Sequence, residues 1–340
     1  MIGGSISATI EVLTPIWERV LQRSTVGTED NFFDSGGDPA SAERFFAEIG
    51  SVCGREFSPL VIFQAPTIAS LAALLGQAQP VPVAPLLPLN SGTGNDSPPI
   101  FVAHGLGDTV MSLFQLVRRW GTSHPVYGMQ ARGVDGLTDP ISRVEEMAHY
   151  HLQAIQRLQP CGPYFLIGYS LGGLVALEIA QCLSRNGEKI GLLAMLDSYP
   201  DRHHLSLGQR ARLEWRLAKG RAASLLRAGG HQLGGEDSSA SASEQHQSEG
   251  SIARAMQRVK DEQYRALRSY RPRFYDGKVR FVRAAIPSYF PEDPVAVWGR
   301  LVRELEVETM PGNHLAMLTT QVETLASIVA RYVEEAAKEK

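Results

Sequence analysis

A serine between two glycines marks the point where an apolar strand pattern gives way to an apolar helix pattern. Residues 166–174 read Leu-Ile-Gly-Tyr-Ser-Leu-Gly-Gly-Leu, which places Ser170 between Gly168 and Gly172. A sharp strand-to-helix turn strains its central residue, and only small flanking residues avoid a clash with it. The serine hydroxyl is then exposed at the helix N-terminus, where backbone N–H groups can stabilise an oxyanion. The pattern predicts that Ser170 is a nucleophile.

A serine nucleophile needs a base and a carboxylate that orients the base. His314 lies between a predicted last strand and the final helix and is the candidate base. Asp197 follows the buried strand expected over residues 192–196, at the edge where open α/β sheets place functional groups. Asp293 follows a later strand, expected over residues 279–283, and is the rival acid. The order Ser, Asp, His fits this kind of site with either aspartate.

The oxyanion of an acyl-transfer intermediate needs two N–H donors. Residues 100–105 form an apolar strand pattern that ends in His-Gly and is followed by Leu106. We expect the N–H of Leu106 and the N–H of Leu171, directly after the nucleophile, to form the oxyanion hole. His104 is interpreted as a structural strand-end histidine rather than a catalytic group.

Length and composition limit the classes of protein to which the chain can belong. The chain has 340 residues, is 44% hydrophobic and 20% charged, and has a net charge of −3, which argues against general nucleic-acid binding. No apolar run long enough to span a membrane and no secretory pattern at the start is evident, so a cytoplasmic location is expected. Three widely spaced cysteines, Cys53, Cys161 and Cys182, predict reduced thiols and neither a disulfide framework nor a metal site.

The chain divides at a Pro- and Gly-rich stretch, residues 79–98, which is interpreted as a linker. Before it, residues 6–78 carry apolar side chains at helical spacing, which predicts a small bundle of four helices. Pro15 is expected to shorten the first helix so that it begins near Thr14. Residues 99–338 form the larger predicted domain.

Residues 29–38, Glu-Asp-Asn-Phe-Phe-Asp-Ser-Gly-Gly-Asp, closely resemble the loop before the second helix of peptidyl and acyl carrier proteins. The matches at residues 16–18 and 63–68 extend this resemblance over most of residues 8–75. In that family the next residue is the serine that receives phosphopantetheine, and here Pro39 occupies that position. Proline has no hydroxyl, yet it fits the first turn of a helix. We expect the carrier fold without its attachment chemistry.

The carrier-like domain is therefore interpreted as vestigial or as a protein-interaction domain. Ser41, two positions later, and Ser35, in the loop, are less favoured substitute attachment sites. No metal and no bound organic cofactor are expected. The acyl group would be carried on the phosphopantetheine of a separate carrier protein or on coenzyme A.

The larger domain resembles the type I thioesterase domains at the ends of nonribosomal peptide and polyketide synthases. The resemblance covers nearly all of residues 99–335 and implies an α/β hydrolase fold, a mostly parallel sheet with helices on both faces, with a helical lid at about residues 199–265. It assigns the catalytic acid to Asp197 rather than Asp293, beside the serine and histidine named above. It rests on six segments in family order: 127–133, 162–164, 168–173, 196–198, 275–279 and 312–314.

The resemblance implies release of an acyl, peptidyl or polyketide chain from a pantetheine thioester through an acyl-enzyme, by hydrolysis or cyclisation. Because its own carrier-like domain lacks the attachment serine, the protein is expected to act in trans, with a carrier protein or synthase module as partner and no nucleic acid or membrane. Two alternatives stay open: a docking or scaffold protein with incidental turnover, and a general carboxylesterase.

Two further groups are interpreted as solvent-exposed. Residues 209–221 read as a basic amphipathic helix, and a solvated face is favoured over steering of an acidic carrier by its arginines, Arg210, Arg212, Arg216 and Arg221. Four histidines match no metal spacing and are expected at the surface: His149, His151, His203 and His204. Residues 228–251 are of low complexity and are expected to be mobile.

Overall fold

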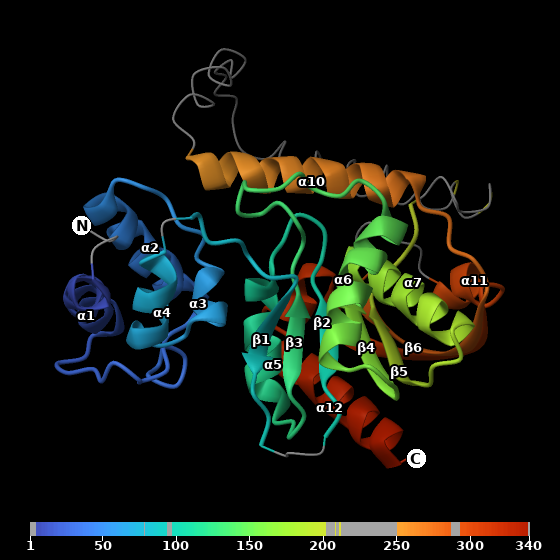
Figure 1. Cartoon of the computed structure of the whole chain (residues 1–340). Helices are drawn as coiled ribbons and strands as arrows, with labels where there is room; N and C mark the ends of the chain where they lie inside the picture. Colours follow the sequence, from blue (N-terminus) through green and yellow to red (C-terminus); the bar gives the residue numbers. More distant parts are fainter. Residues whose placement is uncertain are drawn as a thin grey trace, which may run out of the picture.

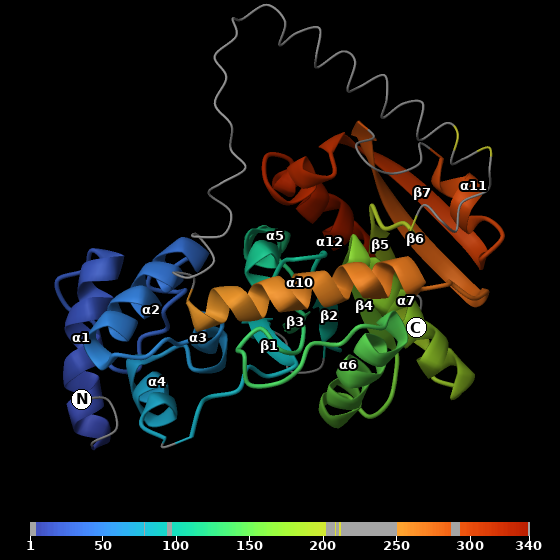
Figure 2. The same ribbon diagram turned by 90° about the horizontal axis from the view of Figure 1, so that it is seen from above.

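A computed structural model of the chain describes residues 5–77, 79–93, 97–201, 208, 211, 250–286 and 293–338. Figure 1 shows a small helical bundle beside a larger domain in which helices cover a central sheet. One long helix, α10 (Ser251–Ser269), crosses above both parts (Figures 1 and 2).

The N-terminal bundle contains four described helices, as the apolar spacing predicts. They are α1 (Ile6–Leu21), α2 (Pro39–Cys53), α3 (Val61–Gln64) and α4 (Ile68–Leu75). Trp17 is fully buried at its centre, with its ring edge-to-face against Phe32 at 4.9 Å and Phe45 at 5.2 Å between ring centroids. Aromatic contacts of this geometry add to the free energy gained from burial.

The first helix differs from its prediction, because α1 begins at Ile6 and continues through Pro15. Pro15 lies on the exposed side of α1, so its ring meets solvent, while Leu13 and Trp17 on the opposite side are buried. Packing of that apolar face outweighs the one backbone hydrogen bond that proline cannot donate.

Among the described residues, the larger domain is built on a seven-stranded sheet in which only β1 is antiparallel to its neighbour. The strand order in space is β1-β3-β2-β4-β5-β6-β7. Their bounds are β1 (Leu86–Asn90), β2 (Ile100–Ala103), β3 (Val126–Met129), β4 (Tyr164–Tyr169), β5 (Ile190–Leu196), β6 (Tyr275–Ile286) and β7 (Val302–Asn313).

Helices cover both faces of the sheet, as predicted for an α/β hydrolase fold. The side chains of α6 (Val144–Leu158) and α7 (Leu171–Arg185) pack with Leu166, whereas those of α5 (Phe114–Trp120) and α12 (Val322–Lys338) pack with Ile167. Adjacent residues of a strand point to opposite faces, so β4 contributes to both cores. Shorter elements complete the domain: η1 (Val110–Leu113), α11 (Pro294–Trp298) and η3 (Leu315–Leu318).

Part of the segment interpreted as a linker belongs to the sheet. Residues 79–98 include β1, in which Leu87 is fully buried and pairs with Gly128 of β3. The Pro-rich composition is tolerated because β1 is an edge strand, where a proline need not donate to a neighbouring strand.

The predicted lid is described only in part. Its last portion forms α10 over the carboxyl ends of the strands (Figure 2). Residues 202–207, 209–210 and 212–249 lie outside the described residues, and they include the four lid arginines named above.

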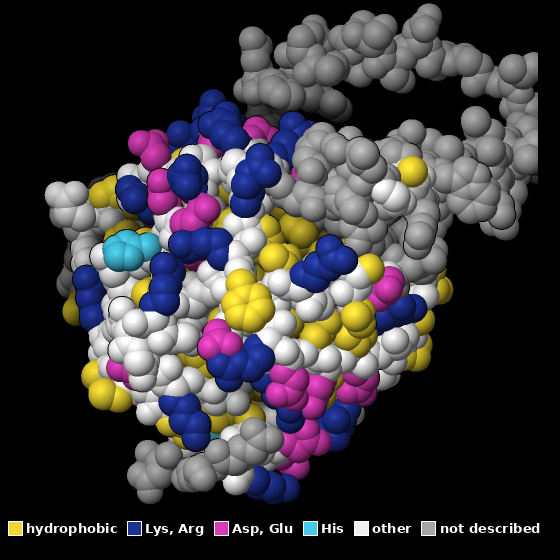
Figure 3. Space-filling view, turned by 90° about the vertical axis from the view of Figure 1, so that its right-hand side faces the viewer, with side chains coloured by type: hydrophobic (Ala, Val, Ile, Leu, Met, Phe, Trp, Pro, Cys, Tyr) yellow, Lys and Arg dark blue, Asp and Glu magenta, His cyan; other side chains and the backbone are white. Residues whose placement is uncertain are grey.

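Charged side chains of both signs are interspersed on the face shown in Figure 3. Opposite charges also pair across neighbouring strands, since the Lys278 ammonium on β6 lies 2.6 Å from a carboxylate oxygen of Glu306 on β7. Within the described ranges, no helix is long and apolar enough to cross a membrane. The same part of the chain holds no cluster of three or more His, Cys, Asp or Glu suited to a metal ion.

Candidate active site

The strand-to-helix turn around Ser170 has the strained geometry that its glycines predict. Strand β4 ends at Tyr169, α7 begins at Leu171, and Ser170 between them has φ 55° and ψ −120°. A side chain at Gly168 would place its Cβ 2.2 Å from the Gly172 carbonyl oxygen. A Cβ at Gly172 would lie 2.4 Å from the carbonyl oxygen of a β2 residue. Both glycines are therefore required by close backbone approach, which holds the serine at the helix N-terminus.

The candidate acid and base lie in direct contact, although 117 positions separate them in the chain. His314 Nδ1 lies 2.8 Å from Asp197 Oδ2, and both residues are buried. The other oxygen of Asp197 accepts the N–H of Ala284 at 3.3 Å. A carboxylate held in this way fixes the tautomer of the imidazole and leaves Nε2 as the proton acceptor.

The rival acid, Asp293, serves a different purpose. Its side chain is exposed and accepts the N–H of Val295 at 2.9 Å, which caps the short helix α11. Of the two aspartates, the structure brings Asp197 to His314.

Tyr169 contacts His314 through both its ring and its hydroxyl group, and the sequence did not predict this contact. Its ring stacks on the His314 imidazole with 4.6 Å between centroids, and its hydroxyl donates to the His314 carbonyl oxygen at 2.8 Å. Burial, reinforced by the nearby Asp197 carboxylate, raises the pKa of Tyr169, so the hydroxyl stays protonated and keeps its donor role. Its position next to the nucleophile was the only signal in the sequence.

A cavity of about 810 Å³ opens over these residues. Ser170 and His314 both line it, as do Leu106 and Leu171, the two residues predicted to donate to an oxyanion. The rest of the lining is largely apolar and includes Met111, Tyr199, Tyr264, Leu267, Leu315 and Leu318. Such a cavity suits an extended apolar group attached near the serine.

His104 is held as a neutral structural group at the end of β2. Its Nδ1 donates to the Gly105 carbonyl oxygen at 2.8 Å, and its Nε2 accepts the N–H of Ala131 at 3.3 Å. Burial lowers the pKa of His104, which keeps this pattern of one donor and one acceptor. The ring thus fixes the loop that carries Leu106.

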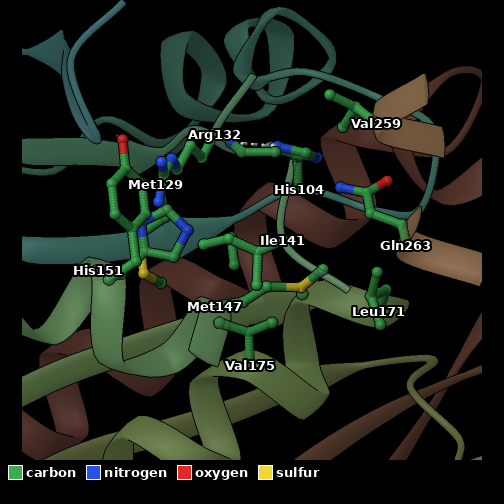
Figure 4. Close-up of a pocket in the computed structure, with 14 residues that line it drawn as sticks. His104, Met129, Arg132, Ile141, Met147, His151, Leu171, Val175, Val259 and Gln263 are labelled. Carbon is green, nitrogen blue, oxygen red and sulfur yellow. Dashed lines mark hydrogen bonds between the residues drawn. The ribbon is translucent and has the colours of Figure 1, made fainter. Parts of the chain in front are cut away.

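A second, smaller pocket lies under α10 (Figure 4). His151 lines it, and this corrects the prediction of a surface position, because the side chain of His151 is buried. His149 is exposed as predicted, whereas His203 and His204 lie outside the described residues. His149 and His151 differ in exposure because positions two residues apart on α6 lie on different faces of the helix.

Burial of His151 should make the stability of the fold depend on pH. Burial, with a smaller contribution from His104, lowers the pKa of His151 from 6.5 to about 3. As the pH falls below 6.5, the unfolded chain binds a proton that the folded chain excludes, so the free energy of unfolding should fall by up to about 1.4 kcal/mol per pH unit. Urea unfolding between about pH 7 and pH 5, where most carboxylates stay ionised, measures this slope.

The His151→Gln variant should have a shallower slope than the wild type over that range. His149→Gln, a change at the exposed neighbour, serves as the matched control and should leave the slope unchanged. Equal slopes for wild type and His151→Gln would contradict a buried neutral imidazole.

Two family models match separate parts of the chain. A family model described as a thioesterase domain matches residues 98–332, and one described as a phosphopantetheine attachment site matches residues 11–75. The chain is 38% identical over 193 residues to a dimodular nonribosomal peptide synthase of Bacillus subtilis, which covers 56% of the chain and 8% of that protein. It is 33% identical over 283 residues to malpibaldin synthetase of Mortierella alpina, covering 82% of the chain and 5% of that protein.

Two solved structures are similar in fold. A four-domain nonribosomal peptide synthetase in its holo form matches with a TM-score of 0.59 at 21% identity, covering 96% of this chain and 26% of that one. A type II thioesterase from the yersiniabactin pathway matches with a TM-score of 0.56 at 15% identity, covering 74% of this chain and 99% of that one. The chain thus spans less than a tenth of the length of the two curated relatives.

Proposed function

We propose that this protein, whose chain belongs to the thioesterase domain family, uses serine catalysis. It releases an acyl, peptidyl or polyketide chain from a pantetheine thioester. The observation that carries this proposal is the shared cavity: Ser170 and His314 line the same space, and His314 is hydrogen-bonded to the buried Asp197. The three residues directly follow β4, β5 and β7, which are parallel strands, so their carboxyl ends lie at one edge of the sheet.

The proposed reaction begins with attack of Ser170 Oγ on the thioester carbonyl while His314 Nε2 takes the hydroxyl proton. Asp197 stabilises the imidazolium, and the N–H groups of Leu106 and Leu171 hold the oxyanion of the tetrahedral intermediate. Collapse of the intermediate breaks the C–S bond, and His314 returns the proton to the departing thiolate. Water, or a hydroxyl or amine of the acyl chain, then attacks the acyl-enzyme and releases the product.

The carrier-like domain does not fit a covalently bound pantetheine at the family position. Pro39 begins α2 there and has no hydroxyl. Ser41 is 4% exposed, and its hydroxyl is bonded to Asp38 at 2.7 Å in the cap of the same helix. We therefore propose that the thioesterase acts in trans, on acyl groups delivered by a separate carrier protein or coenzyme A.

Restoring the serine tests this proposal. Wild-type protein incubated with a pantetheinyl transferase and coenzyme A should keep its intact mass. The Pro39→Ser variant, with a hydroxyl at the family position, should gain the mass of one phosphopantetheine group. A pantetheine adduct on the wild type would overturn the proposal of a silent carrier domain.

The reaction class is tested with a pair of matched substrates. Turnover of an acyl pantetheine thioester should exceed that of the corresponding oxygen ester, measured as kcat/KM for the same acyl group. Equal or greater turnover of the oxygen ester would favour a general carboxylesterase. The absence of turnover on both would favour a docking or scaffold protein, the alternative that the missing attachment serine supports.

A further inference from the structure

The carrier-like domain is packed against the thioesterase domain through a continuous apolar interface. The Phe33 ring contacts Phe63 of its own domain at 4.8 Å and Phe114 of α5 at 4.9 Å between centroids. Arg118, also on α5, donates to the Phe33 carbonyl oxygen at 3.1 Å. Buried residues of both domains, including Val259 of α10, belong to one core cluster. The domain that has lost its attachment serine is thus part of the enzyme's packing.

The same domain supplies the N-terminal cap of α10. Helix α10 begins after Gly250, which has no side chain to cap it. Glu56, of the carrier-like domain, instead accepts the Ser251 hydroxyl at 2.6 Å and the Ile252 N–H at 3.1 Å. A carboxylate at this end of a helix satisfies unpaired N–H groups and interacts favourably with the helix dipole. These hydrogen bonds also lower the pKa of Glu56, so the cap stays charged at neutral pH.

Three turns further along, α10 contacts the loop that carries the proposed oxyanion donor. Gln263 is 3% exposed, and its Oε1 accepts the N–H of Gly107 at 2.6 Å. Gly107 directly follows Leu106 and has φ +72°. Figure 4 shows Gln263 reaching from α10 toward His104 and Leu171. A polar side chain on the buried face of a helix costs free energy unless it is paired, so this position is occupied for its hydrogen bond.

We propose that the carrier-like domain acts as a positioning domain for catalysis, with Glu56 fixing α10 and Gln263 on α10 fixing the oxyanion loop. The helix between these contacts is a rigid rod of about 18 Å, so a displacement at its capped end is transmitted to Gly107. The inference rests on the proposed function, because it assigns the oxyanion role to Leu106. Glu56 and Gln263 are positioning residues and do not contact substrate.

The test combines four single variants and one double variant with two readouts. Gln263→Met removes the acceptor at nearly constant volume, Gln263→Glu retains an acceptor, and Glu56→Ala removes the cap. Glu48→Ala is the matched control, since Glu48 is a partly exposed glutamate of the same domain whose ion-pair partner is Arg19, also in that domain. The readouts are kcat and KM for an acyl pantetheine thioester, and hydrogen exchange of the peptide that contains Gly107. Thermal unfolding verifies that each variant is folded.

We expect Gln263→Met to lower kcat by about 10- to 100-fold with little change in KM, because the loop acts on the transition state. Gln263→Glu should recover part of this loss, and Glu56→Ala should lower kcat by about 3- to 10-fold. The double variant Glu56→Ala, Gln263→Met should match Gln263→Met alone, because both act through one helix. Exchange at Gly107 should rise in both single variants, and Glu48→Ala should resemble the wild type.

A Glu56→Ala variant with wild-type kcat and wild-type exchange at Gly107 would overturn the inference. So would fully additive effects of the two changes. Failure of the proposed function is distinguishable, because the wild type would then lack turnover while hydrogen exchange still reports whether α10 holds the loop.

Discussion

Replacing Ser170 by alanine is expected to lower kcat for an acyl pantetheine thioester by roughly 10⁴-fold or more. The alanine cannot form an acyl-enzyme, and only binding and the oxyanion donors remain to accelerate attack by water. The fold should be unaffected, because alanine tolerates the turn no worse than serine and no hydrogen bond of the Ser170 side chain caps α7. Steady-state kinetics with purified variant and wild type measure the loss.

Ser198→Ala provides the control for this change. Ser198 is a fully buried serine whose hydroxyl bonds to backbone carbonyl oxygens, at 3.3 Å to that of Gly168, so its loss should affect stability more than turnover. A Ser170→Ala protein that retains more than about a tenth of wild-type kcat would contradict the assignment of the nucleophile.

Replacing Asp197 by asparagine is expected to lower kcat by roughly 10³- to 10⁴-fold. The amide is neutral and can turn its NH₂ toward His314 Nδ1. The imidazole would then carry its proton on Nε2, the atom that must accept the serine proton. Thermal unfolding should change little, since the substitution conserves shape. Kinetics and unfolding of the same preparation separate the two effects.

Asp293→Asn is the matched control, because it makes the same chemical change at the other aspartate that follows a strand. Its side chain caps α11, and an asparagine caps a helix nearly as well as an aspartate. We expect wild-type kcat for this variant. A large loss in Asp293→Asn together with a small loss in Asp197→Asn would reverse the assignment of the acid.

Local sterics made the nucleophile turn predictable from sequence. The glycines on either side of Ser170 are fixed by contacts within a few residues or to the adjacent strand, and the apolar runs of β4 and α7 carry the strand and helix periods. The two aspartates could not be separated in this way. The resemblance to thioesterases selected Asp197, and the structure places Asp197, 117 positions away in the chain, in hydrogen-bond contact with His314, whereas Asp293 caps α11.

Three sequence-based predictions differ from the structure: those for Pro15, for the linker segment and for His151. Pro15 has a low helix propensity, but burial of the α1 face on the bundle core outweighs it. The strand β1 looks like linker because its composition is that of an extended chain, and its pairing with β3, about 40 residues later, cannot be read locally. His151 shares the buried face of α6 with Ala148, Leu152 and Ile155, so helical spacing did indicate burial, and only the polar side-chain type favoured the surface.

The carrier-like domain has the helical fold although Pro39 occupies the position where the attachment serine is expected. Pro39 removes the attachment hydroxyl and at the same time suits the first turn of α2, so the helix is retained. What remains is a surface that packs on α5 and caps α10. The positioning role proposed above would give this surface a reason to persist.

Intact-mass spectrometry after treatment with a serine-reactive fluorophosphonate tests the central claim most directly. The wild type should gain one phosphonate group, Ser170→Ala should gain none, and peptide mapping of the wild type should place the group on Ser170. A wild-type protein that stays unmodified, or that is modified equally in Ser170→Ala, would contradict the account of Ser170 as the activated nucleophile of a thioesterase.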